Sequence, residues 1–293
     1  MNWQTISEQI EIATSQAFQA LTATPLAGGD INSAFLLQSA TQSYFVKLNH
    51  SASLPMFEAE RMGLEEIANT STVRVPDAIA CGKTDTHSFL VLENLEFGTT
   101  SNKSDRLLGQ QIAHMHLKQK AFFGWPINNT IGSTPQLNDR CNNWVAFWRE
   151  QRLGFQLSLA AKNGYGGHLQ SSGERLMSDL DCLFTNYQPI PSLLHGDLWT
   201  GNAATDREGN PVIFDPACYY GDREAELAMT ELFGGFSYDF YATYQDVYPL
   251  DSNYSIRKSL YNLYHVLNHL NLFGGGYLRQ AENLIAKLLV ELS

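Results

Sequence analysis

The pattern of hydrophobic and polar residues changes about one third of the way along the chain. Before that point, residues 33–38, 44–49 and 88–92 are rich in β-branched and aromatic side chains, which predicts three strands. Residues 55–69 repeat hydrophobic side chains at helical spacing and predict a helix that packs on the small sheet. A further helix is expected near the N-terminus, opened by a capping box from Thr5 to Glu8 and running to about residue 20.

From about residue 103 onward the hydrophobic period is that of a helix. Long helical stretches are predicted at residues 104–118, 142–159, 172–187, 224–233 and 255–273. The pattern therefore predicts an α+β fold of two lobes. A small β-rich lobe is expected over residues 1–95, and a larger, mainly helical lobe over residues 96–293.

Composition narrows the class of protein. With 293 residues, 44% of them hydrophobic, the chain can bury a substantial core. The formal net charge of −11 argues against nucleic acid as a partner, because phosphate backbones require a basic surface. No apolar run is long enough to span a bilayer and no signal peptide is recognisable, so no membrane association and a cytoplasmic location are expected.

The negative charge is concentrated between residues 176 and 251. This segment holds thirteen acidic residues against two basic ones, Arg207 and Arg223. Such a segment favours metal ions and cationic ligands, although a solvated acidic surface is the alternative interpretation.

The strongest chemical signal is His195-Gly196-Asp197, followed by Asn202 and then by Asp215 at the end of an apolar run. Phosphoryl transfer to a hydroxyl needs one aspartate to accept the proton, and an asparagine and a second aspartate to hold Mg²⁺. Asp197, Asn202 and Asp215 fit these three roles in order and spacing. An ordinary turn capped by Asn202 is the alternative, which the second motif at the right distance argues against.

An ATP site of this type also needs a lysine on a strand, held by a glutamate on a helix. Lys47 lies inside an apolar strand, and Glu60 shares a helical face with Phe57 and Leu64, whereas Glu58 lies on the polar face. Lys47 and Glu60 are therefore predicted to form the pair that holds the phosphates. An exposed lysine on an edge strand is the alternative.

The remaining parts of an ATP site are predicted from position alone. Gly28 and Gly29 lie where a flexible loop would cover the phosphates, although a Gly-Gly pair also commonly makes a hairpin turn. Glu93, Asn94 and Leu95 follow the third strand, where a hinge between the lobes would bind adenine. Together with the motifs, these positions predict a protein-kinase-like fold that uses ATP and Mg²⁺.

The expected substrate is a small molecule. The His-Gly-Asp motif lacks the arginine that couples a catalytic loop to a phosphorylated activation loop, and only about seven residues separate Asp215 from the next predicted helix. Trp199 and Tyr219 are candidates for contact with the substrate, although both could be core aromatics. His265 and His269 are expected to be core or substrate-pocket residues rather than zinc ligands.

The chain resembles the fructosamine kinase (ketosamine 3-kinase) family, related in fold to aminoglycoside and choline kinases. The resemblance spans nearly the whole length and rests on segments such as GGDINSAF, FGWPINNTIGSTPQLND, LLHGDLWTGN and LNHLNLFGGGY. It implies ATP-dependent phosphorylation of the C3 hydroxyl of free or protein-bound ketosamines, and hence a role in deglycation. It also implies the same roles for the residues above: Asp197 as proton acceptor, Asn202 and Asp215 as metal ligands, Lys47 and Glu60 at the phosphates, and residues 93–95 at adenine.

Two rival functions stay open at this point. An aminoglycoside or other amino-alcohol kinase would use the same ATP machinery. A non-catalytic nucleotide-binding regulator is disfavoured, because such proteins usually lose at least one of Lys47, Asp197, Asn202 and Asp215, and all four are present.

Overall fold

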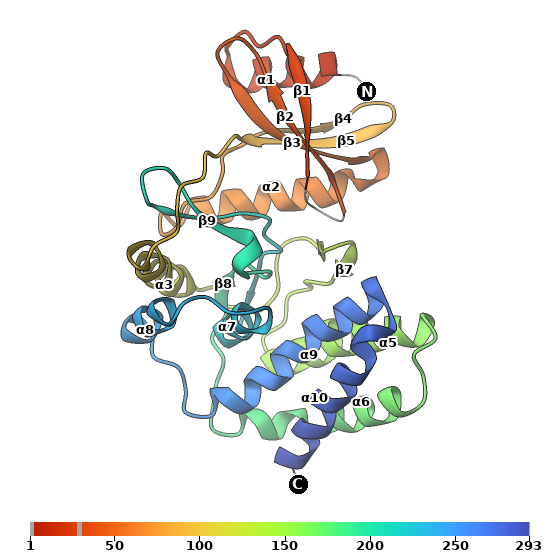
Figure 1. Ribbon diagram of the computed structural model, residues 1–293. Helices are drawn as coiled ribbons and strands as arrows, with labels where there is room; N and C mark the ends of the chain where they lie inside the picture. Colours follow the sequence, from red (N-terminus) through yellow and green to blue (C-terminus); the bar gives the residue numbers. More distant parts are fainter. Residues whose placement is uncertain (1–2, 28–30, 293) are drawn as a thin grey trace.

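The computed structural model describes residues 3–27 and 31–292, and its N-terminal part is an antiparallel sheet between two helices (Figure 1). The sheet has five strands in the order β1-β2-β3-β5-β4. The elements are α1 (Trp3–Thr14), β1 (Thr22–Leu26), β2 (Ser33–Gln38), β3 (Ser43–His50), α2 (Leu54–Ala68), β4 (Ala78–Lys83) and β5 (His87–Glu93).

The two faces of this sheet belong to different hydrophobic clusters. Val46 and Leu48 of β3 pack with Ile6 and Ile10 of α1. Phe45 faces the opposite way and packs with the cluster that contains Phe57 of α2. Because side chains alternate along a strand, Lys47 shares the face of Phe45 and is directed toward α2.

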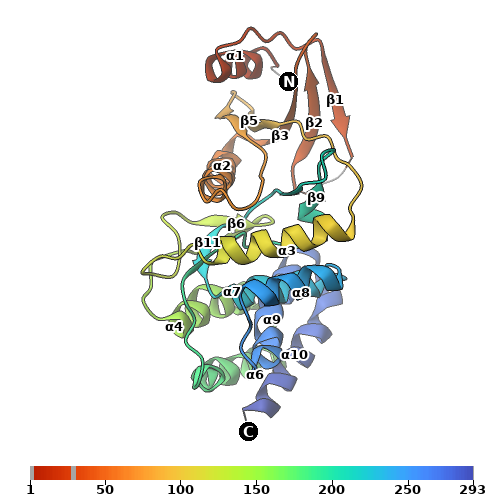
Figure 2. The same ribbon diagram turned by 90° about the vertical axis from the view of Figure 1, so that its left-hand side faces the viewer.

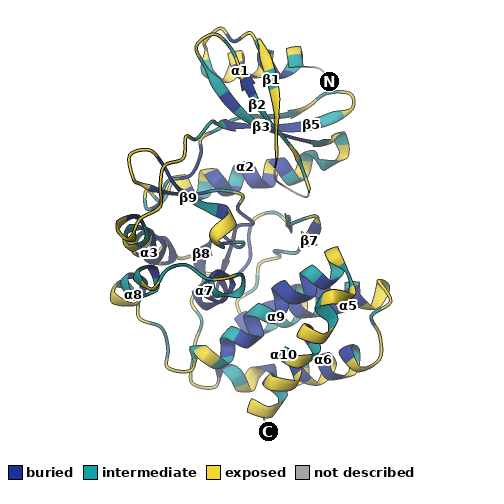
Figure 3. Ribbon diagram, viewed as in Figure 1, coloured by how far each residue is buried: buried dark blue, intermediate teal, exposed yellow. Residues whose placement is uncertain are grey.

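The C-terminal part is mainly helical and is built around the long helix α9, whose buried side is visible in Figure 3. Helix α9 packs against α5, α7 and α10, while α3 pairs with α8 (Figure 2). The helices are α3 (Asn102–His116), α4 (Trp144–Trp148), α5 (Phe155–Lys162), α6 (His168–Ser178), α7 (Arg223–Leu232), α8 (Tyr238–Val247), α9 (Tyr254–Phe273) and α10 (Leu278–Glu291).

Three two-stranded ladders lie between α2 and the helices (Figures 1 and 2). They pair β6 (Asn129–Ile131) with β7 (Thr134–Gln136), β8 (Ser192–Leu194) with β11 (Tyr219–Gly221), and β9 (Ala203–Thr205) with β10 (Pro211–Ile213). Residues 195–202 connect β8 to β9, and Asp215 lies between β10 and β11. The short ladders thus bring the two sequence motifs together.

The structure differs from three of the predicted helices. The helix expected at 172–187 is wrong in its bounds, because α6 runs from His168 to Ser178 and a short 3₁₀-helix, Leu180–Phe184, follows it. Helix α1 begins at Trp3 and ends at Thr14, so the capping box at Thr5 and the extension to residue 20 are wrong. The helix expected at 142–159 is interrupted by a π-helix, Arg149–Gly154, between α4 and α5. Three predicted strands are confirmed, whereas the division into lobes at residue 95 stays a prediction.

None of the described helices is both long and apolar enough to cross a membrane.

Candidate active site

The loop that carries Asp197 touches the loop that carries Asp215 backbone to backbone. Gly196 has φ +86°, and a Cβ at this position would lie 2.1 Å from the carbonyl oxygen of Ala217. The amide of Ala217 donates to the carbonyl of His195 at 2.8 Å. Only glycine allows this approach, because any side chain would push the two loops apart.

A buried carboxylate, Glu226 of α7, holds the backbone of the Asp197 loop. Its two oxygens accept from the amide of Gly196 at 2.7 Å, the amide of His195 at 3.2 Å and Nε2 of His116 at 2.8 Å. Burial alone would raise the pKa of Glu226, but the hydrogen bond and charge of His116, together with His195 and the Gly196 amide, hold it below its usual value. Glu226 is therefore an ionised anchor, which the sequence did not single out from the other acidic residues.

The ring of His195 joins the two motifs. Its Nε2 donates to the carbonyl of Phe214 at 2.9 Å, and its Nδ1 accepts from the amide of Asp197 at 3.3 Å. Burial lowers the pKa of His195. These two bonds require a neutral ring with its proton on Nε2. His195 thus fixes Asp197 and the residue before Asp215 with one side chain.

Asp197 is well suited to accept a proton. Burial, and then the nearby charge of Asp215, raise the pKa of Asp197 to about 7, which is the range in which a general base works near neutral pH. The side-chain nitrogen of Asn202 donates to the Asp197 carbonyl at 2.8 Å and to its carboxylate at 3.3 Å. With its nitrogen used in this way, Asn202 has its amide oxygen left for a cation.

Lys47 lies between two carboxylates. Its Nζ is 2.6 Å from Oε1 of Glu60 and 2.5 Å from Oδ1 of Asp215. Burial alone would lower the pKa of Lys47, but the charges of Glu60 and Asp215 raise it, so the ammonium stays charged. The predicted pairing of Lys47 with Glu60 is confirmed, while Glu58 is exposed.

The oxygen atoms at this place fit Mg²⁺. Asp215 supplies a half-exposed carboxylate with only one oxygen bound to Lys47, and Asn202 supplies its amide oxygen. The described residues contain no cluster of three or more His, Cys, Asp or Glu side chains that could enclose a metal. Two hard oxygen ligands from the protein match a cation that completes its shell with phosphate and water.

The predicted hinge residues are tied to other parts of the chain. The Glu93 carboxylate accepts from Arg74 at 2.6 Å, and Arg74 also binds Asp206 at 2.6 Å. The Glu93 amide donates to Asp77 at 2.8 Å, and the side chain of Asn94 donates to Ser43 at 3.1 Å. Adenine binding would therefore fall to the Glu93 carbonyl and the Leu95 backbone. Gly28 and Gly29 lie outside the described residues.

The two aromatic candidates for substrate contact lie in different surroundings. Trp199 belongs to an aromatic cluster, here defined as Trp199, Phe233, His269, Phe273 and Tyr277, in which neighbouring rings are 4.8–6.4 Å apart. Tyr219 is only 3% exposed and its ring lies 4.2 Å from the guanidinium of Arg152. The structure thus makes Tyr219 a core residue, which corrects its prediction as a substrate contact.

The acidic segment is not a free anionic surface. Eight of its thirteen carboxylates form ion pairs within the protein: Asp181, Asp206, Asp215, Glu224, Glu226, Glu231, Asp239 and Asp251. Asp222 is fully buried and accepts from the hydroxyls of Tyr187 and Tyr261. Most of these carboxylates therefore have a partner inside the protein, while the expected preference of the segment for metal ions and cationic ligands stays a prediction.

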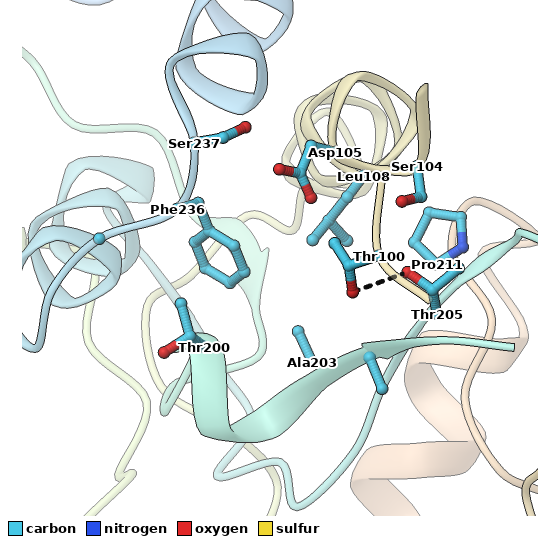
Figure 4. A pocket seen from close by; sticks show the side chains of 12 residues that line it. Thr100, Ser104, Asp105, Leu108, Thr200, Ala203, Thr205, Pro211, Phe236 and Ser237 are labelled. Atoms are coloured by element: carbon cyan, nitrogen blue, oxygen red, sulfur yellow. Dashed lines mark hydrogen bonds between the residues drawn. The ribbon is translucent and has the colours of Figure 1, made fainter. Parts of the chain in front are cut away.

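A small cavity of about 170 Å³ borders the Asp197 loop on the side of α3 (Figure 4). Thr200 of the loop faces it together with Asp105 of α3 and Ser237, which precedes α8. Its lining includes none of Lys47, Asp197 and Asp215, so this cavity is not the site of phosphoryl transfer.

The fold and the grouping of Lys47, Asp197 and Asp215 define a protein-kinase-like phosphotransferase. A family model described as fructosamine kinase matches residues 2–291. The chain is 47% identical over 288 residues to a protein of Synechocystis sp. named probable ketoamine kinase, with 98% of this chain and 97% of the relative covered. It is 43% identical over 262 residues to protein-ribulosamine 3-kinase of Arabidopsis thaliana, with 88% and 79% covered. The chain belongs to the fructosamine kinase family.

Solved structures agree with this assignment. A crystal structure from Haemophilus somnus, provisionally named fructosamine-3-kinase, superposes with a TM-score of 0.91 at 30% identity and covers 98% of this chain and 97% of its own. An aminoglycoside phosphotransferase in complex with ADP and hygromycin B gives a TM-score of 0.65 at 13% identity, with 98% of each chain covered, which shows the fold alone. The predicted two-lobed protein-kinase-like fold is confirmed.

Proposed function

We propose that this protein transfers the γ-phosphoryl group of ATP to the C3 hydroxyl of a ketosamine, free or protein-bound, and so promotes deglycation. The observation that carries the proposal is the convergence of Asp197, Asn202, Asp215 and the Lys47–Glu60 pair in a member of this family. The names of the ketoamine kinase and ribulosamine 3-kinase relatives support the substrate class.

In the proposed reaction, the Asp197 carboxylate accepts the proton of the sugar hydroxyl. The hydroxyl oxygen then bonds to the γ-phosphorus, the bond from that phosphorus to the β-bridging oxygen breaks, and ADP leaves. Lys47 holds the α- and β-phosphates. Asn202 and Asp215 would hold Mg²⁺, which neutralises phosphate charge when bound.

Recognition of the amine part falls to local contacts, because the acidic segment is internally paired. Trp199 and its aromatic cluster lie next to the loop of Asp197, and aromatic faces attract ammonium groups. A ketosamine presents a hydroxyl to Asp197 and an amine that is cationic when protonated. Neither the parent sugar nor the free amine offers both.

The test compares kcat/KM for a ribulose- or fructose-derived lysine adduct, the parent sugar, the free amine and an aminoglycoside, with ATP and Mg²⁺. Losing a desolvated cation contact costs about 2 kcal/mol, so the adduct should be preferred to the sugar by about thirtyfold. Preference for the aminoglycoside or the bare sugar would exclude ketosamines as the substrate class.

The matched control in this assay is Asp197→Asn. It keeps the size of the side chain but removes the proton acceptor, so kcat should fall by about 10²- to 10⁴-fold while ATP still binds. A variant that retains more than half of the wild-type kcat would remove Asp197 from its proposed role.

A further inference from the structure

Two buried amides of the β6–β7 hairpin bind the backbone just after Asp215. Asn129 Nδ2 donates to the carbonyl of Cys218 at 2.8 Å, and Gln136 Nε2 donates to the carbonyl of Ala217 at 3.1 Å. The hairpin pairs Asn129 directly with Gln136, whose Nε2 also donates to Asn129 Oδ1 at 2.9 Å. The two side chains are 8% and 1% exposed, so these bonds are shielded from water.

Neighbouring side chains fix the orientation of both amides. Arg152 carries only donors and binds Oδ1 of Asn138 at 2.9 Å, which turns the Asn138 nitrogen toward Asn129 Oδ1, also at 2.9 Å. The nitrogen of Asn129 is thereby left for Cys218. Tyr264 donates its hydroxyl to Gln136 Oε1 at 2.7 Å, which leaves the Gln136 nitrogen for Ala217. One donor of Asn129 and one of Gln136 are thereby directed toward the Asp215 loop.

Arg152 is a costly residue in this position. It is fully buried, lies on the π-helix, and forms no salt bridge among the described residues. Its Nε has no hydrogen-bond partner, and its charge is covered by the rings of Phe147, Tyr219 and Tyr264. A buried unpaired charge is unfavourable, and π-helical turns are frequent at functional sites. The orientation of the Asn138 and Asn129 amides explains why an arginine is buried at this position.

The loop held in this way is strained at its metal ligand. Asp215 has φ +60°, a left-handed conformation that is uncommon for non-glycine residues, although aspartate adopts it more readily than most, and that is sparsely populated without support from the surroundings. His195 binds the chain at Phe214 and Ala217. The hairpin amides bind the carbonyls of Ala217 and Cys218, so Asp215 is constrained on both sides.

We propose that Gln136 and Asn129 are positioning residues that hold Asp215 in the conformation needed to bind the metal. They act through the backbone of Ala217 and Cys218 and, being buried, do not touch the substrate. The inference rests on the proposed function for the role of Asp215 as a metal ligand, while the restraint on the loop stands on the hydrogen bonds alone.

The restraint is tested by hydrogen exchange of the ligand-free protein. Gln136→Met keeps the volume but removes the donor, so the amides of Phe214, Asp215, Ala217 and Cys218 should exchange about tenfold faster than in wild type. The control is Ser88→Ala, which removes a fully buried donor to a backbone carbonyl, that of His50, and does not reach the loop. Exchange at residues 214–218 that matches wild type in Gln136→Met would overturn the proposal.

The consequence for the metal is tested by the dissociation constant of ATP measured with Mg²⁺ and with EDTA. The enhancement of ATP binding by Mg²⁺ should shrink by about tenfold in Gln136→Met and stay unchanged in Ser88→Ala. Tyr264→Phe removes a single hydroxyl and should change the ratio in the same direction by less, which covers the case in which Gln136→Met does not fold. An unchanged ratio in a variant whose loop exchanges faster would overturn the positioning role. If the dissociation constant of ATP for the wild-type protein were the same with Mg²⁺ and with EDTA, the metal-binding role given to Asp215 in the proposed function would instead be overturned.

Discussion

Lys47 binds Glu60 and Asp215 at once, and this double contact sets what each residue can do. Burial makes the lysine depend on its carboxylates, since an uncompensated charge in this position would be unstable. The Glu60 carboxylate has no hydrogen-bond partner other than Lys47 among the described residues. Asp215, in contrast, keeps one carboxylate oxygen for a cation.

This geometry predicts that Lys47 and Glu60 act as a unit in ATP use. Lys47→Ala should lower kcat/KM for ATP, and adding Glu60→Ala should cost little more, with a coupling energy of about 1 kcal/mol or greater in a double-mutant cycle. Glu58→Ala is the control, because this residue lies on the same helix but is exposed. Additive losses in the Lys47 and Glu60 pair would show that Glu60 does not hold the lysine.

At the scale of elements, the close contact between the Asp197 loop and the Asp215 loop depends on one glycine. Gly196→Ala would place a methyl group against the Ala217 carbonyl and would strain a backbone of φ +86°. Gly209→Ala is a matched control, because Gly209 has φ +88° in the β9–β10 turn but open space around it. In the control, backbone strain alone should lower the free energy of unfolding by about 1 kcal/mol. Its activity should be kept.

Gly196→Ala should lose the same amount of stability through backbone strain. In addition, it should lose most of its kcat, because the proton acceptor and the metal ligand move apart. The measurement is kcat together with the free energy of unfolding for both variants. Equal kcat in the two variants would show that contact between the loops is not needed for catalysis.

The sequence predicted those elements whose own pattern is strong. Strands β2, β3 and β5 were recognisable because β-branched and aromatic residues dominate them. Strand β1 is a mostly exposed edge strand that contains Pro25, and β4 contains Gly82 and a register shift, so both have weak patterns. Helix α10 was not predicted, although Ala281, Ile285 and Leu288 recur at helical spacing and form one buried face.

The candidate site was predictable where a local motif carries the chemistry, as for Asp197, Asn202 and Asp215. The residues that hold the two loops of the site in place were not predictable. Glu226 reaches Gly196 across 30 residues and Asn129 reaches Cys218 across 89, and neither contact leaves a trace in local spacing. Trp199 and Tyr219 are both aromatic residues near the motifs, and only the tertiary packing separates the partly exposed ring from the buried one.

At the scale of the whole molecule, burial disfavours the charged form of several histidines. Burial lowers the pKa of His265 to about 3, with the neighbouring His269 and Arg152 acting in the same direction. Burial also lowers the pKa of His269 and of His195. In the unfolded chain a histidine titrates near pH 6.5. Below that pH the unfolded state therefore binds more protons than the folded state, and the free energy of unfolding falls as the pH falls.

His265 should contribute about 2 kcal/mol to the loss of stability between pH 7 and pH 5, because its folded pKa lies well below this interval and its unfolded pKa lies within it. His265→Phe removes the titrating group and keeps an aromatic ring, so its free energy of unfolding should change with pH by about 2 kcal/mol less than that of wild type. The measurement is urea unfolding at both pH values, with His114→Phe, at an exposed position of α3, as the control that retains the wild-type pH dependence. If His265→Phe lost as much stability as wild type on acidification, His265 would have to be protonated in the folded protein. Its pKa would then not be lowered by its burial beside Tyr264 and Arg152.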